Sequence, residues 1–65
     1  MNRYVVEPNK DASRWIVTLE GVAPDDSYPT KSGAIDAAEE LAKANTPSKV
    51  IILDDDHNEV EERTY

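Results

Sequence analysis

The sequence predicts an α+β fold, a single β-β-α-β-β domain with a mainly antiparallel sheet and one helix packed on one face. Three observations support this fold. Two runs of β-branched and aromatic residues stand near the start of the chain, apolar residues recur at helical spacing in the middle, and two further strand-like runs follow Pro47. The chain has 65 residues, the size of one small domain, which we expect to span residues 1–65.

The first two strands are expected over residues 3–7 and 15–20, joined as a hairpin by the polar residues between them. In the first strand Tyr4 and Val6 share one face, which we assign to the core, and Val5 lies on the other. The second strand alternates in the way that is typical of a half-buried strand. Its core face is predicted to consist of Trp15, Val17 and Leu19, with Trp15 as the anchor.

Residues 21–29 contain glycine, prolines and aspartates, which favour a loop, and the helix is expected over residues 31–45. Thr30 stands at the N-cap position, where its hydroxyl accepts from a free amide of the first turn, and Pro47 prevents a longer helix. Gly33 in the first turn weakens the helix by about 1 kcal/mol relative to alanine. The face packed on the sheet is predicted to consist of Ala34, Ile35, Ala38, Leu41 and Ala42.

Residues 49–53 are almost all aliphatic, which predicts a central strand covered on both faces. Residues 54–58 are typical of a polar turn, and residues 59–65 predict a short last strand. The sheet face away from the helix then exposes an apolar strip that a partner can bury. The alternative is a solvated face with scattered apolar residues. The partner-binding residues predicted on this face are Val5 and Ile16, together with Ile51 or Ile52.

Acidic residues are concentrated in the second half of the chain. The sequence contains 14 acidic and 7 basic side chains, a formal charge of −7. Residues 1–33 hold five acidic and four basic groups, whereas residues 34–65 hold nine and three. Such a chain repels nucleic acid and anionic membranes, so we expect neither as a direct partner. If the helix and the last hairpin lie on one side, their carboxylates form a negative partner-binding patch: Asp36, Glu39, Glu40, Asp54, Asp55, Asp56, Glu59, Glu61 and Glu62.

No metal, cofactor or catalytic residue is predicted. Asp54, Asp56 and Asn58 match the first, third and fifth positions of a calcium-binding EF-hand loop. However, Glu59 stands where that loop needs glycine, and Tyr65 stands where it needs a bidentate carboxylate. The chain has one histidine and no cysteine, which leaves no usual ligand set for a transition metal. No motif activates a nucleophile, so we expect a protein that is not an enzyme.

Membrane insertion and secretion are not expected. The longest apolar run, residues 50–53, is far shorter than the roughly 20 residues that span a bilayer. The first residues lack the apolar stretch and small-residue cleavage site of a secretory signal. We therefore expect a cytoplasmic protein.

Three segments match the pattern of a known family: WIVTLEG at residues 15–21, YPTKSGAIDAAEELAK at 28–43 and SKVIILD at 48–54. With these segments the chain resembles the small prokaryotic and phage family called domain of unknown function 2188. The resemblance implies a tryptophan strand, an alanine-rich helix, an aliphatic strand and an acidic turn before the last strand, and it implies no activity. The family often has Asp-Gly in the last turn. This chain has His57 and Asn58 there, which implies a longer or looser hairpin.

Two classes of function are consistent with these features. In the first, the chain is a non-enzymatic acidic protein-interaction module, encoded by a phage or other mobile element, that binds and inhibits a host protein. In a sharper form, its carboxylates imitate nucleic acid and block a nucleic-acid-binding enzyme. In the second, the chain is a housekeeping structural domain, soluble and homodimeric, whose charge serves solubility. Lysine substitutions in the last hairpin distinguish the two, because they abolish partner binding only in the first.

Overall fold

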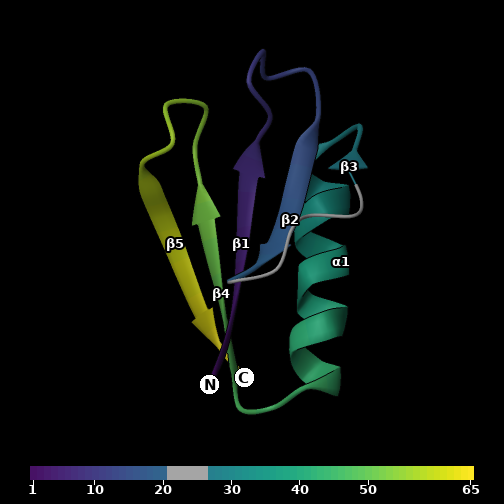
Figure 1. The fold of residues 1–65 in the computed structure, drawn as a ribbon, viewed down its shortest axis with the longest axis vertical. Helices are drawn as coiled ribbons and strands as arrows, with labels where there is room; N and C mark the ends of the chain where they lie inside the picture. The colour runs from purple at the N-terminus through teal and green to yellow at the C-terminus, as the bar shows by residue number, and fades with distance from the viewer. Residues whose placement is uncertain (21–26) are drawn as a thin grey trace.

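Five strands and one helix make up the part of the chain that the structure, a computed structural model, describes: residues 1–20 and 27–65. The strands form one sheet in the order β3-β2-β1-β4-β5, and helix α1 lies against one face of it (Figure 1). Within these residues no helix has the length and apolarity to cross a membrane. The bounds of the elements are Asn2–Pro8 for β1, Trp15–Leu19 for β2, Ser27–Tyr28 for β3, Lys31–Ala44 for α1, Ser48–Leu53 for β4 and Glu59–Thr64 for β5.

The α+β class is confirmed, but the sheet is mixed, so the expectation of a mainly antiparallel sheet is wrong. β1 pairs with β4 in parallel, with Tyr4 opposite Val50 and Val6 opposite Ile52. The neighbouring pairs β1–β2 and β4–β5 are antiparallel. A parallel pair needs a crossover connection, and here α1 carries the chain from the β2 side of β1 to its other side. As a result β1, not β4, is the central strand.

A short strand lies within the expected loop over residues 21–29. This strand, β3 (Ser27–Tyr28), pairs antiparallel with β2. Arg14 anchors it, because its Nε and Nη2 atoms donate to the Oγ and the backbone carbonyl of Ser27, at 2.7 and 3.0 Å. Of the rest of the predicted loop, Pro29 is an exposed bend residue before the helix, and residues 21–26 lie outside the described residues.

Both ends of the chain meet at one end of the sheet (Figure 1). The backbone N–H of Asn2 donates to the carbonyl of Pro47 at 3.2 Å, and Ser48 and Tyr65 exchange backbone hydrogen bonds of 3.0 and 2.8 Å. The peptide bond between Thr46 and Pro47 is cis. The turns of the β1–β2 and β4–β5 hairpins lie at the opposite end of the sheet.

Helix α1 begins where predicted and ends one residue earlier. Thr30 is the N-cap, and its Oγ1 accepts from the backbone N–H of Gly33 at 3.0 Å. A Cβ atom at Gly33 would lie 3.1 Å from this oxygen, so the absent side chain leaves room for the cap. At the other end Asn45 is the C-cap: its backbone N–H donates to the carbonyl of Ala42 and its Nδ2 to that of Leu41.

The core lies between α1 and the sheet, and small side chains bring the two close together. Ala34, Ala38 and Ala42 are 0% exposed and form the line along which the helix contacts the sheet. The sheet contributes the buried side chains of Tyr4, Val6, Trp15, Val50 and Ile52, which confirms the predicted core face of the first two strands.

Leu41 is the exception to the predicted helix face, because its side chain is 44% exposed. It lies about 60° around the helix from Ala38, outside the alanine line. Ile35 lies at about the same angle on the other side and packs partly buried against the core. The contact surface of α1 is therefore narrower than the apolar stripe of the sequence.

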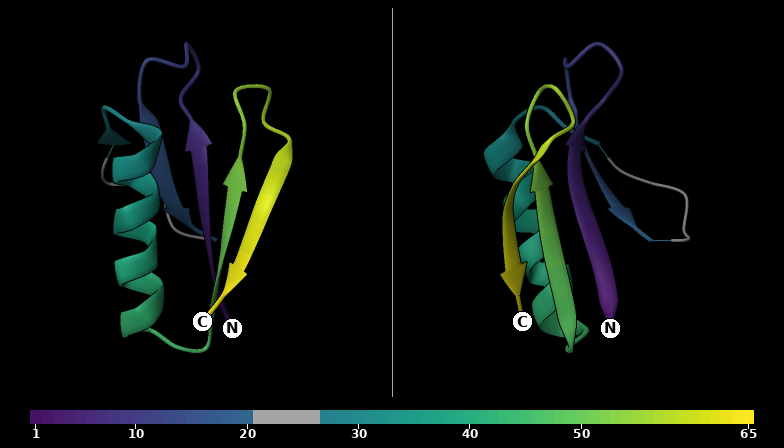
Figure 2. Two further views of the ribbon diagram at one scale, coloured as in Figure 1. Left: turned by 180° about the vertical axis from the view of Figure 1, so that it is seen from behind. Right: turned by 90° about the vertical axis from the view of Figure 1, so that its left-hand side faces the viewer.

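The other face of the sheet, the open face, carries no described element; Figure 2 shows α1 on one side of the sheet only. Ile51 lies on this face, yet it is only 3% exposed. Glu62 of β5 is its cross-strand neighbour, and the Lys49–Glu62 ion pair, 3.1 Å long, places two aliphatic stems beside it. Side chains rather than a second layer thus cover this part of β4. By strand alternation and pairing the open face comprises Arg3, Val5, Glu7, Ile16, Thr18, Lys49, Ile51, Leu53, Glu59, Glu62 and Thr64. Glu20, just after β2, forms an ion pair of 3.1 Å with Arg3.

Candidate functional site

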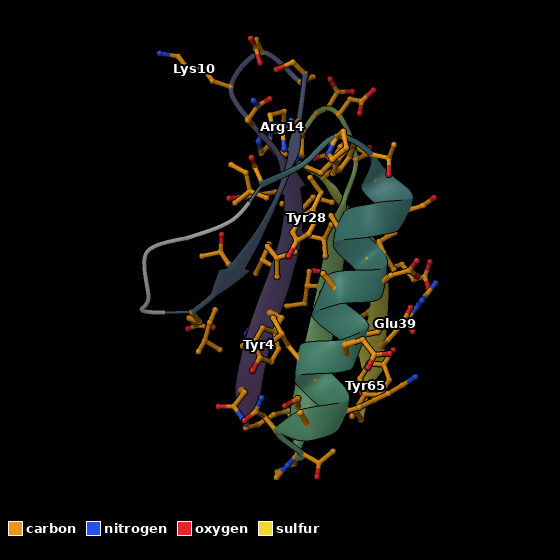
Figure 3. The ribbon with its side chains drawn as sticks, turned by 90° about the vertical axis from the view of Figure 1, so that its right-hand side faces the viewer. Tyr4, Lys10, Arg14, Tyr28, Glu39 and Tyr65 are labelled. Atoms are coloured by element: carbon orange, nitrogen blue, oxygen red, sulfur yellow. The ribbon has the colours of Figure 1, made fainter. Side chains whose placement is uncertain are left out.

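Arg63 binds two carboxylates at the edge between β5 and α1. Its guanidinium donates to Glu61 on the same strand and to Glu39 on the helix. β5 places Glu61 and Arg63 on the core side of the sheet, because they pair with Ile52 and Val50, which face the helix. Figure 3 shows Glu39 on the side of α1 along which β5 runs.

The contacts of Arg63 favour the charged forms of the groups involved. The hydrogen bond from Arg63 lowers the pKa of the Glu61 carboxyl, and the positive charge of the guanidinium adds to this effect. The hydrogen bond to Glu61 in turn raises the pKa of Arg63. A carboxyl with a lowered pKa is an anion at neutral pH, so Glu61 is suited to accept hydrogen bonds rather than to donate a proton.

The turn over residues 54–58 is closed by the carboxylate of Asp54. Its Oδ1 accepts from the backbone N–H groups of Asp56 and Asn58, each at 2.9 Å. His57 completes the turn with a φ of 62°, and its Nε2 lies 3.1 Å from the carbonyl oxygen of Pro8. The turn is therefore fixed to the neighbouring hairpin.

Lys31 connects this turn to the start of α1. A shallow hollow is lined by Lys31 and the three consecutive aspartates, Asp54, Asp55 and Asp56. The Nζ atom of Lys31 also lies 5.3 Å from the ring centroid of Trp15, a cation–π arrangement that orients the side chain. The acidic turn and the first turn of the helix are thus neighbours in the fold.

The structure gathers seven of the nine predicted patch residues on the helix side of the molecule, in what we call the acidic band. Asp36 and Glu40 lie on the exposed side of α1, next to Glu39. Glu61 joins Glu39 through Arg63, and Lys31 joins the helix to the turn. The acidic band consists of Asp36, Glu39, Glu40, Asp54, Asp55, Asp56 and Glu61.

Two predicted patch residues lie outside the acidic band. Glu62 is on the open face, where it pairs with Lys49, because successive residues of a strand point to opposite faces. Glu59 is exposed at the β-bulge that starts β5. Sequence reasoning missed Arg63 and Lys31, which interrupt the band. Arg63 stands two residues from Glu61 and therefore lies on the same face of the strand. This neighbourhood can be predicted only when the strand has been assigned to these residues.

The predicted sheet-face residues, Val5 and Ile16, lie on the open face, as expected. Both are half-buried. They are on the opposite side of the sheet from the acidic band, so the two candidate surfaces are separate.

No described residues form a group of three or more histidine, cysteine or acidic side chains that could hold a metal ion. The EF-hand match has a structural explanation, because the Asp54 carboxylate caps the amides of its own turn. The chemistry that the acidic band offers is the binding of cationic groups by fixed anions.

These features define a small α+β protein with a mixed five-stranded sheet, one covering helix and an acidic band beside that helix. The chain belongs to the DUF2188 family, whose model, described as an uncharacterized protein conserved in bacteria, matches residues 3–65. It is also similar to the uncharacterized protein YycD of Bacillus subtilis (strain 168), with 40% identity over 65 residues that cover 100% of this chain and 98% of YycD. No solved structure shows a significant match.

Proposed function

We propose that the protein is a non-enzymatic interaction module that binds a basic surface of another protein through its acidic band. The observation that carries this proposal is the attachment of the carboxylates to fixed elements. Arg63 orients Glu39 and Glu61, and Asp54 closes a turn that is itself tied to Pro8. Groups that are already ordered lose less conformational entropy on binding.

The exposed carboxylates of the acidic band provide the electrostatic attraction to a basic partner. Asp36, Glu40, Asp55 and Asp56 are exposed, and no described basic side chain forms an ion pair with them. Charges of this kind speed up association with an oppositely charged partner and determine its orientation. The ordered carboxylates would define the contact geometry, while the exposed ones would guide the partner to it.

A nucleic-acid-binding enzyme has the kind of surface that the acidic band fits, and inhibition of such an enzyme is the finer form of the proposal. Arg63 and Lys31 interrupt the band, in contrast to the continuous negative charge of a phosphate backbone. We therefore propose binding to a basic protein surface, with occlusion of a nucleic-acid site as one outcome of the test.

The proposal is tested by capture of proteins from a lysate of the native host on the immobilised full chain. Substitution of Asp55 and Asp56 by lysine should reduce capture of the specific partner at least about tenfold. A matched control replaces Asp11 and Glu20 by lysine, which changes the total charge equally outside the acidic band. Circular dichroism checks that each variant is folded.

A partner retained by the wild type and the control, but not by the band variant, supports the proposal. If the retained protein binds DNA or RNA, competition by that nucleic acid supports the finer form. Equal capture by all three chains, or loss of capture by the control alone, would rule out the acidic band as the binding surface.

A further inference from the structure

We draw no further inference here: the strongest candidate, the outer edge of the sheet along β5, carries none, because the carboxylates of Glu61 and Glu62 already form ion pairs within the chain and nothing in the structure shows what covers that edge.

Discussion

Arg63 on β5 forms an ion pair with Glu39 on α1, and this side-chain contact joins two elements whose backbones lie apart. The helix contacts β1, β2, β3 and β4 directly, whereas it reaches the edge strand β5 through this pair. The residues of β5 are exposed or half-buried. The edge strand is therefore attached to the helix by charge, and the strength of this attachment should depend on pH and salt.

The contribution of Glu61 to stability should disappear in acid. Arg63 lowers the folded-state pKa of Glu61, while the unfolded chain keeps the ordinary pKa of a glutamate. The stabilisation is therefore complete above this ordinary value and is lost as the pH falls through the lower folded-state pKa. Glu61→Gln should lower the free energy of unfolding at neutral pH and have no effect in strong acid, as measured by urea denaturation across the pH range. Glu59→Gln is the control on the same strand, and a difference that persists in strong acid would contradict the assigned cause.

Substitution of a buried alanine by a larger residue should push the helix away from the sheet and so destabilise the protein. Ala38 is 0% exposed at the middle of the alanine line, so Ala38→Leu forces three additional heavy atoms into a filled space. The expected loss is about 1–3 kcal/mol in the free energy of unfolding, measured by chemical denaturation. Ala44→Leu, at an exposed position of the same helix, should change stability by much less. Equal effects at the two positions would show that the helix is not held at close approach.

Removal of the Thr18 hydroxyl should stabilise the protein. The Oγ1 atom of Thr18 is buried and finds no hydrogen-bond partner among residues 1–20 and 27–65. Because an unpaired buried hydroxyl retains its desolvation cost, Thr18→Val should raise the free energy of unfolding by about 1 kcal/mol. Thr64→Val, at an exposed position of β5, is the control. A loss of stability in Thr18→Val alone would mean that the hydroxyl has a partner.

Glycine should be favoured at a turn residue with left-handed backbone geometry. Ala12 has a φ of 59°, and its N–H closes the β1–β2 turn on the carbonyl of Asn9 at 3.0 Å. Ala12→Gly removes the steric cost of this conformation and should stabilise the protein by about 0.5–1 kcal/mol. Ala37→Gly, inside the helix, should destabilise it by about 1 kcal/mol. Thermal unfolding followed by circular dichroism measures both, and a loss of stability in Ala12→Gly would contradict the assigned strain.

Local patterns were sufficient to predict the helix, four of the strands and most of the core. Thr30 as N-cap and Trp15, Tyr4 and Val6 as core residues follow from residue type and spacing, which act within a few positions of the chain. The parallel pairing of β1 with β4 was missed because it depends on where the helix crosses the sheet. Leu41 was misplaced for a related reason: the width of a buried helix face is set by the partner surface as well as by the apolar stripe.

The acidic band was only partly predictable. Its carboxylates are visible in the composition, but the assignment of Glu62 to the opposite face needed the register of β5. His57 illustrates the same limit. It adopts a φ of 62° in the turn of the last hairpin, with its imidazole near Pro8. Such a long-range contact has no local sequence signal.

The parallel pairing of β1 with β4 also determines the order in which the chain can assemble during synthesis. Asn2 and Ser48, neighbours in the sheet, are 46 positions apart. When the first 45 residues have left the ribosome, the β1–β2 hairpin and α1 are complete, yet the alanine line still lacks Val50 and Ile52 beneath it. The central strand therefore acquires its second neighbour only after the helix has been made, so the core can close only once the residues of β4 are available.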